Sequence, residues 1–192
     1  GSVYSLKELN EIAQVVKMFP NVNILSDDIY EHITYENQPF LNIAQVEPSL
    51  KERTLILNGV SKSYSMTGWR LGYGAGSKRL IEAMIAIQSQ STSNATSISQ
   101  HAALEALSGP QHFIEKNKRI FENRRNLLLD ILRQSEDIQL LKPMGTFYAF
   151  PSIEKLIGKK TKDGNFIKSD TDFTVQLLKE TGVAVVPGSA FG

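Results

Sequence analysis

The chain has 192 residues, 21 of them basic and 20 acidic, so its formal net charge is +1, and its scattered cations do not favour nucleic acid. It has no cysteine, which excludes a disulfide framework, a thiolate nucleophile and a cysteine-based metal site. Its apolar stretches are too short to span a bilayer and its three histidines are scattered, so we expect a cytoplasmic globular protein without a metal centre.

Hydrophobic periodicity predicts alternating helices and strands over the first part of the chain. A helix is expected over residues 5–19, with Ser5 as its N-cap and Glu8 completing a capping box. Further elements are expected in chain order: strands at 22–25, 54–57 and 71–75, and helices at 77–90, 97–107 and 111–135. This alternation is typical of an α/β fold.

The pattern changes beyond residue 135. Paired strands are expected at 138–141 and 146–150, around the turn sequence Pro-Met-Gly. A helix should follow at 170–181, then a strand at 183–186 and a terminal loop at 187–192. These elements predict a second, smaller lobe.

A lysine flanked by hydroxyl side chains follows the second predicted strand, in the sequence Ser-Lys-Ser-Tyr-Ser-Met-Thr-Gly-Trp-Arg at 61–70. A lysine that attacks an aldehyde must be neutral, and nearby positive charge in a partly desolvated cleft lowers its pKa. Arg70, eight positions after Lys62, supplies that charge, and its planar fork can bind a phosphate, with Ser61 and Ser63 as further donors. On this local pattern alone, a solvated surface lysine is the commoner interpretation.

The polar sequence Ser-Asp-Asp-Ile-Tyr-Glu at 26–31 follows the first predicted strand. Ligands of open α/β sheets collect outside the carboxyl ends of strands. A carboxylate there can keep a pyridinium nitrogen protonated, and Tyr30 can hydrogen-bond a phenolic oxygen of the same ring. The alternative is that Asp27 or Asp28 only caps the following turn.

Three other patterns are interpreted as structural. The glycines between residues 68 and 76 lie within and after a strand, with no Gly-x-Gly-x-x-Gly opening a helix, so no dinucleotide loop is predicted. The three histidines have no partner at metal-ligand spacing. The arginine pair at 124–125 is expected on the solvated face of the long helix.

Four segments together resemble class I aminotransferases, which are fold-type I pyridoxal-phosphate enzymes, and in particular the bacterial aspartate aminotransferases. They are Ser-Asp-Asp-Ile-Tyr-Glu-His at 26–32, Asn-Gly-Val-Ser-Lys-Ser-Tyr-Ser-Met-Thr-Gly-Trp-Arg-Leu-Gly-Tyr at 58–73, Gly-Thr-Phe-Tyr at 145–148 and Val-Pro-Gly-Ser-Ala-Phe-Gly at 186–192. The resemblance implies an α/β fold in which residues 1–125 are the C-terminal part of a large, mainly parallel-sheet domain and residues 126–192 a truncated small α+β domain.

The resemblance also implies roles for single residues. Asp27 would pair with the ring nitrogen of pyridoxal 5'-phosphate, Tyr30 would donate to its ring oxygen, and Lys62 would hold the cofactor as a Schiff base and later shuttle a proton. The candidates for the phosphate are Arg70, Ser61 and Ser63. This chain has Gly59 where the family often has a serine three positions before the lysine.

The activity implied is transfer of an amino group from an L-amino acid, with aspartate as the first expectation, to 2-oxoglutarate by a ping-pong mechanism. The partners would be these amino-acid and 2-oxo-acid substrates and, in a full-length protein, a second subunit of a homodimer. Ser89 stands where animal-type enzymes carry an arginine that reads the distal carboxylate, so prephenate and aromatic amino acids stay open.

The sequence lacks the family's N-terminal motifs and its substrate-binding C-terminal arginine, so we expect a fragment that is inactive alone. Two alternatives keep the cofactor but change the function. The same fold hosts β-lyases and aminocyclopropane-carboxylate synthases. A cofactor-sensing effector domain of a transcription regulator is the other alternative, although the near-neutral charge gives no support to it.

Overall fold

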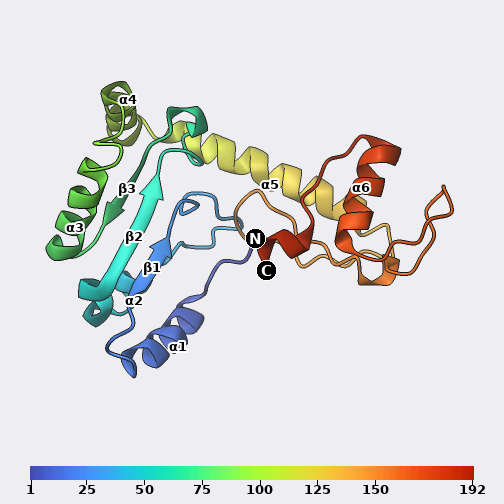
Figure 1. Cartoon of the computed structure of the whole chain (residues 1–192), viewed down its shortest axis with the longest axis horizontal. Helices are drawn as coiled ribbons and strands as arrows, with labels where there is room; N and C mark the ends of the chain where they lie inside the picture. The colour runs from blue at the N-terminus through green and yellow to red at the C-terminus, as the bar shows by residue number, and fades with distance from the viewer. The chain divides into compact units, whose positions relative to one another are not determined.

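The computed structural model describes residues 1–192, which divide into two compact units (Figure 1). The sheet unit consists of Ser2–Phe121 with Met144–Thr146. The C-terminal unit consists of Gly1, Glu122–Pro143 and Phe147–Gly192. The long helix α5 (His112–Leu132) contributes residues to both units.

The sheet has three strands in the order β1 (Ile24–Asp27), β2 (Thr54–Gly59) and β3 (Gly72–Ala75). β1 and β2 are parallel, with Asp27 opposite Leu57, whereas β3 is antiparallel to β2, with Tyr73 opposite Asn58. The carboxyl ends of β1 and β2 therefore lie at the same edge of the sheet (Figure 1).

The first strand begins two residues later than the sequence predicts and includes the polar pair Ser26 and Asp27. The reason lies in the preceding turn, because the amide of Val22 donates to the carbonyl of Phe19 and its own carbonyl accepts from Arg53. Val22 therefore belongs to the turn that follows the first helix and does not pair with β2.

Helix α1 (Leu6–Lys17) confirms the predicted helix and its cap. Ser5 Oγ accepts from the amide of Glu8 at 3.3 Å, and the Glu8 carboxylate accepts from the amide of Ser5 at 2.7 Å. The buried face of α1 packs Leu9 and Ala13 against Ile43 of α2 (Ile43–Val46) and Leu50 of η1 (Pro48–Arg53). This cluster is the apolar core beside the sheet.

Three further helices agree with the predicted ranges to within three residues at each end. They are α3 (Lys78–Ser89), α4 (Ser97–Ser108) and α5. Ser99 Oγ of α4 donates to the carbonyl of Trp69 at 2.8 Å, which ties α4 to the short helix η2 (Thr67–Trp69).

The predicted paired strands at 138–141 and 146–150 are wrong. Gln139 forms a single bridge with Ser152, and Gly145 forms one with Thr34. The backbone around Gly145 is engaged by the sheet unit instead, since the amide of Thr146 donates to the Ile33 carbonyl at 2.8 Å. A side chain at Gly145 would meet that same carbonyl at 2.9 Å, so this close approach requires glycine.

In the C-terminal unit, α6 (Asp170–Thr181) has the predicted bounds and ends at Gly182, whose φ is +73°. The predicted strand at 183–186 is wrong, because this segment pairs with no strand. The chain is held instead at η4 (Gly188–Phe191), where Asp170 accepts from the amide of Ser189 at 2.6 Å. The bonds that Asp170 accepts from the amide and from the hydroxyl of Ser189 lower its pKa.

The predicted solvated arginine pair is half wrong. Arg124 is exposed, but Arg125 is 8% exposed, and its Nη1 donates to the carbonyl of Pro143 at 2.8 Å. Consecutive helical residues point about 100° apart, so adjacent arginines need not share a face.

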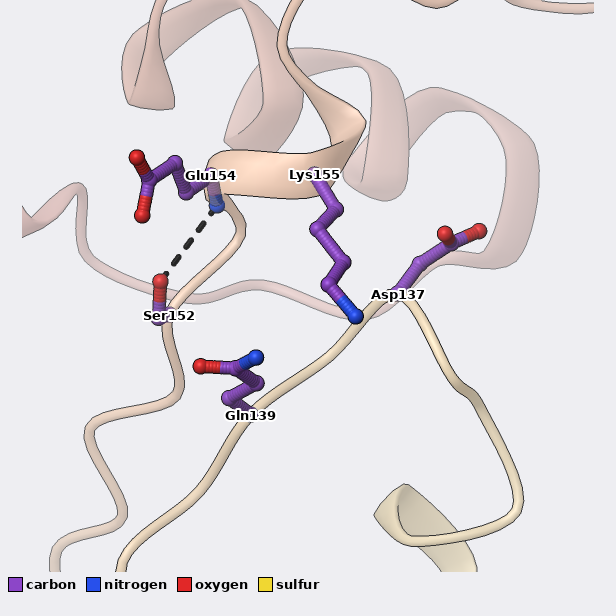
Figure 2. A pocket seen from close by; sticks show the side chains of 5 residues that line it. All are labelled: Asp137, Gln139, Ser152, Glu154 and Lys155. Carbon is purple, nitrogen blue, oxygen red and sulfur yellow. Dashed lines mark hydrogen bonds between the residues drawn. The ribbon is translucent and has the colours of Figure 1, made fainter.

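The C-terminal unit also contains a pocket of about 320 Å³ (Figure 2). Its lining residues are Asp137, Gln139, Ser152, Glu154 and Lys155. Lys155 Nζ donates to the carbonyl of Glu136 at 3.0 Å, and the amide of Glu154 donates to Ser152 Oγ at 3.4 Å. The pocket includes none of the residues that the sequence singled out.

Arg53 should be a major contributor to the stability of the sheet unit. Its guanidinium donates to the carbonyls of Phe19 at 2.7 Å, Val22 at 2.8 Å and Val16 at 2.9 Å, so it caps the end of α1. Arg53→Lys keeps the charge but loses the fork, and it should lower the free energy of unfolding by about 1–3 kcal/mol. Urea unfolding measures this, and Arg79→Lys on exposed α3 is the control. Equal unfolding midpoints for the two variants would contradict the role.

Glu47 should give α1 an acid-sensitive attachment. Bonds from Lys17 at 2.9 Å and from Ser49 lower the pKa of Glu47 from 4.5 to about 2. Because this folded pKa lies below the unfolded one, the stabilisation is complete above pH 4.5 and is lost as the pH falls towards 2. Glu47→Gln should therefore lower the thermal midpoint at neutral pH, and the two curves should converge near pH 2. A pH-independent difference would refute this assignment.

Candidate active site

Two turns leave the sheet at the carboxyl ends of its parallel strands. The β1 turn comprises residues 28–32, and the β2 turn comprises residues 60–65. Lys62 on the β2 turn is half-buried, and its Nζ lies 5.6 Å from the centre of the Tyr30 ring on the β1 turn. The parallel register therefore brings together two residues that are far apart in the sequence, in a cation–π contact.

The two adjacent aspartates have different environments. Asp28 is 6% exposed, and its carboxylate accepts from Ser26 Oγ at 2.7 Å and from Asn42 Nδ2. Asp27, the last residue of β1, is exposed, and its Oδ1 accepts from the amide of Ile29 at 3.3 Å. Asp27 thus caps the turn, as the alternative interpretation expected, yet it also presents a carboxylate at the sheet edge.

The two serines beside Lys62 are enclosed to different degrees. Ser61 is half-buried, whereas Ser63 is 5% exposed and its Oγ has no hydrogen-bond partner. A buried donor without a partner is destabilising by about 1–3 kcal/mol. Such a group is therefore expected where a ligand or another function compensates for it.

Arg70 lies at the same edge of the sheet. It follows η2 with a left-handed φ of +52° and precedes Gly72, which pairs with Gly59 at the end of β2. Its guanidinium is exposed, and Nη1 donates to the carbonyl of Thr67 at 2.8 Å. This hydrogen bond stays within the turn that contains Arg70. Arg70 is therefore not part of the contact between Lys62 and Tyr30.

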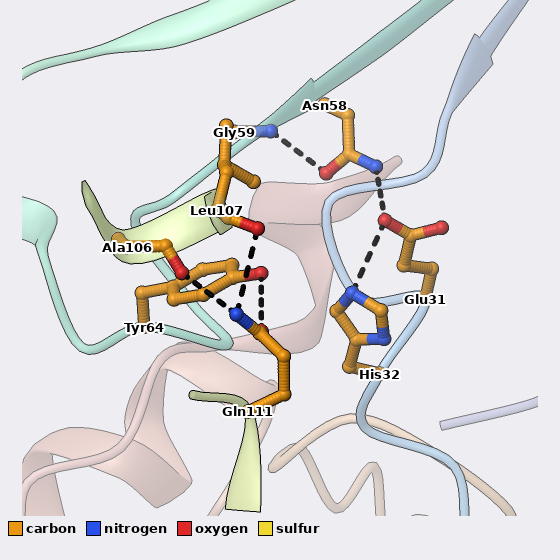
Figure 3. A network of polar contacts seen from close by, with 8 residues as sticks. All are labelled: Glu31, His32, Asn58, Gly59, Tyr64, Ala106, Leu107 and Gln111. Carbon is orange, nitrogen blue, oxygen red and sulfur yellow. Dashed lines mark hydrogen bonds and ion pairs between the residues drawn. The ribbon is translucent and has the colours of Figure 1, made fainter. Parts of the chain in front are cut away.

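Polar contacts join the β1 turn to β2, and a ring contact joins it to the β2 turn (Figure 3). Glu31 Oε1 accepts from Asn58 Nδ2 at 2.7 Å and lies 3.5 Å from His32 Nε2. The rings of His32 and Tyr64 form a T-shaped pair, with their centres 6.4 Å apart. The sequence pattern predicted no role for Glu31, Asn58 or Tyr64. The only signal available was that each lies within four residues of Tyr30 or Lys62 in the sequence.

Tyr64 carries the network to the connection between α4 and α5. Its hydroxyl donates to Gln111 Oε1 at 2.9 Å, and Gln111 Nε2 donates to the carbonyl of Ala106 at 3.0 Å (Figure 3). Gln111 Nε2 also donates to the carbonyl of Gly109 at 2.6 Å. Burial, and then the charge of Glu31, raise the pKa of Tyr64. The phenol is therefore neutral at physiological pH and available as a hydrogen-bond donor.

The family model described as aminotransferase class I and II matches residues 1–192. The chain belongs to this family. A probable aspartate/prephenate aminotransferase of Rickettsia prowazekii is 55% identical over 100% of the chain and 48% of that protein. The aspartate aminotransferase of Rhizobium meliloti is 47% identical over 100% of the chain and 47% of that protein. The chain thus spans about half the length of the curated relatives it matches.

Solved structures of the family confirm the predicted fold class. A crystal structure of the Rhizobium meliloti aspartate aminotransferase superposes with a TM-score of 0.94 at 47% identity, covering 98% of this chain and 47% of that one. An aromatic aminotransferase from Pyrococcus horikoshii gives a TM-score of 0.86 at 34% identity, covering 100% of this chain and 48% of that one. The chain therefore has the α/β fold of fold-type I aminotransferases. Its helices include none with the length and apolar character of a membrane span.

The two aspartates should respond differently to the same isosteric change. Asp28→Asn turns one acceptor of the buried network into a donor that faces Asn42 Nδ2 or Ser26 Oγ. It should lower the free energy of unfolding by about 1–3 kcal/mol. Asp27→Asn keeps an oxygen for the Ile29 amide and should change it by less than about 0.5 kcal/mol. Urea unfolding of the two variants measures these changes. Equal losses of unfolding free energy would show that both carboxylates are structural.

Proposed function

We propose that this chain forms part of a pyridoxal-phosphate-dependent aminotransferase that moves an amino group from an L-amino acid, aspartate above all, to 2-oxoglutarate. The observation that carries the proposal is the placement of Lys62. Lys62 is half-buried at the carboxyl edge of two parallel strands, and its amine lies over the ring of Tyr30. Family membership and the names of the relatives support the reaction class.

The residues at this edge fit the chemical groups of pyridoxal 5'-phosphate. Its aldehyde requires an amine, which Lys62 supplies, and its ring nitrogen requires a carboxylate, which the exposed Asp27 supplies. Its ring oxygen requires a donor such as the Tyr30 hydroxyl. Its phosphate requires donors, and the candidates are the partnerless Ser63 Oγ, the half-buried Ser61 and the exposed guanidinium of Arg70.

The cofactor, when bound, supplies an electron sink for the negative charge that develops on a substrate α-carbon. The protein groups have distinct tasks beside it. Asp27 would keep a proton on the ring nitrogen by charge attraction, and the Tyr30 hydroxyl would donate to the ring oxygen. Lys62 would hold the cofactor through its amine and, when that amine is free, would move a proton to and from the α-carbon.

We place residues 1–125 in the large cofactor-binding domain of the whole enzyme and residues 126–192 in its small domain. The whole enzyme would be a cytoplasmic homodimer that uses small amino acids and 2-oxo acids. Prephenate is a second candidate substrate, because the relatives from Rickettsia prowazekii and Cereibacter sphaeroides carry aspartate/prephenate names. An aromatic substrate is favoured in the same way by the Pyrococcus horikoshii structure.

Lys62 should be the lysine that the cofactor selects. After incubation of the chain with pyridoxal 5'-phosphate and reduction with borohydride, peptide mapping should find the cofactor on Lys62 in excess over the other lysines. Before the reduction, the same incubation should give a visible absorbance band, which borohydride then removes as it reduces the C=N bond. Lys62→Ala should abolish the band and leave only background labelling, whereas Lys78→Ala on exposed α3 should change neither. Labelling spread evenly over the lysines would refute the proposed site.

A further inference from the structure

Glu31 occupies a position between the two turns that carry the candidate site. It follows Tyr30 directly on the β1 turn, and its carboxylate accepts from Asn58 of β2, four residues before Lys62. The hydrogen bond of 2.7 Å therefore crosses from one strand end to the next. A charge-assisted bond of this kind fixes the separation of the groups more tightly than apolar contact does.

A second route joins the same turns through aromatic rings. Glu31 lies 3.5 Å from His32 Nε2, and the His32 ring meets the edge of the Tyr64 ring on the β2 turn. Tyr64 also packs against Phe113, with ring centres 5.8 Å apart, and donates to Gln111. The β2 turn is thus held from both sides, by the β1 turn and by the start of α5.

The exposure of these groups suggests that the network determines geometry rather than global stability. The side chains of Glu31 and His32 retain 31% and 44% of their exposure, and ion pairs that are this open contribute little to unfolding free energy. Burial raises the pKa of both Tyr64 and Tyr73, and the charge of Glu31 raises it further, so Glu31 lies electrostatically close to the β2 turn and to β3.

We propose that Glu31 is a positioning residue that sets Tyr30 relative to Lys62, through Asn58 on one side and through His32 and Tyr64 on the other. This inference rests on the proposed function, since the position of Lys62 matters because its amine must meet the cofactor while Tyr30 contacts the ring. Misplacement of a reacting group by about 1 Å is enough to lower its reactivity by one to two orders of magnitude.

The test uses Glu31→Ala and Asn58→Ala, with Glu31→Gln as the conservative variant and Arg53→Lys as a control that loosens α1 away from the sheet edge. Hydrogen exchange of the amides in residues 28–32 and 60–65 reports on the two turns without the cofactor. Borohydride trapping of pyridoxal 5'-phosphate reports the selectivity for Lys62 over the other lysines.

Glu31→Ala should accelerate exchange in both turns together by about tenfold and lower the selectivity for Lys62 by about tenfold. Asn58→Ala should act in the same direction. Glu31→Gln keeps an acceptor for Asn58 and should restore most of both values. Arg53→Lys should lower stability while leaving the exchange of the two turns and the Lys62 selectivity as they are.

The inference is overturned if Glu31→Ala leaves exchange in either turn unchanged, or if exchange rises while the Lys62 selectivity stays at its original value. The second result would make Glu31 merely structural. Failure of the proposed function gives a different result, because the unaltered chain would then show no selectivity for Lys62 at all.

Discussion

The parallel pairing of β1 with β2 is the constraint on which the candidate site depends. With Asp27 opposite Leu57, both strands end at one edge of the sheet, and the turn that leaves each strand carries part of the site. Parallel strands need a long connection, and here it contains α2 and η1, which pack against α1. The apolar cluster of Leu9, Ala13, Ile43 and Leu50 therefore maintains the register that aligns Tyr30 with Lys62.

The strand end of β1 divides structural and chemical tasks between neighbouring acids. Side chains alternate along a strand, so Asp28 turns into the network with Ser26 and Asn42 while Asp27 faces outward. Asn42 also caps α2 through the amide of Ala44 at 2.8 Å, so the buried acid is tied to the connection between the parallel strands. The exposed acid can then act on a ligand without loss of a fold contact.

Local patterns in the sequence were sufficient where the physics is local. The capping box of Ser5 and the bounds of α6 follow from side chains within a few residues of each other. The strands expected at 138–150 failed because the amide of Thr146 finds the distant carbonyl of Ile33, and the environment of Arg125 depends on the carbonyl of Pro143. The local pattern alone did not distinguish Asp27 from Asp28, which only the family resemblance separated, because the burial of Asp28 depends on the distant Asn42. It did not reveal Glu31 either, because its partner Asn58 lies on another strand.

The proposed chemistry requires one movable group among fixed ones, and the fold distributes rigidity in that way. Asp27 belongs to a strand, and the Ile29 amide donates to one of its carboxylate oxygens, so the backbone that carries this carboxylate is fixed. Lys62 sits on a turn, and its flexible four-carbon side chain spans half-buried space, so its amine can leave one bonding partner and reach another. The turn itself must then stay fixed while the amine moves, because the groups of a site are held precisely only when the contacts that support them are rigid. The side-chain bonds from Glu31 to Asn58 and from Tyr64 to Gln111 meet that requirement, because they tie down the chain four residues before Lys62 and two residues after it.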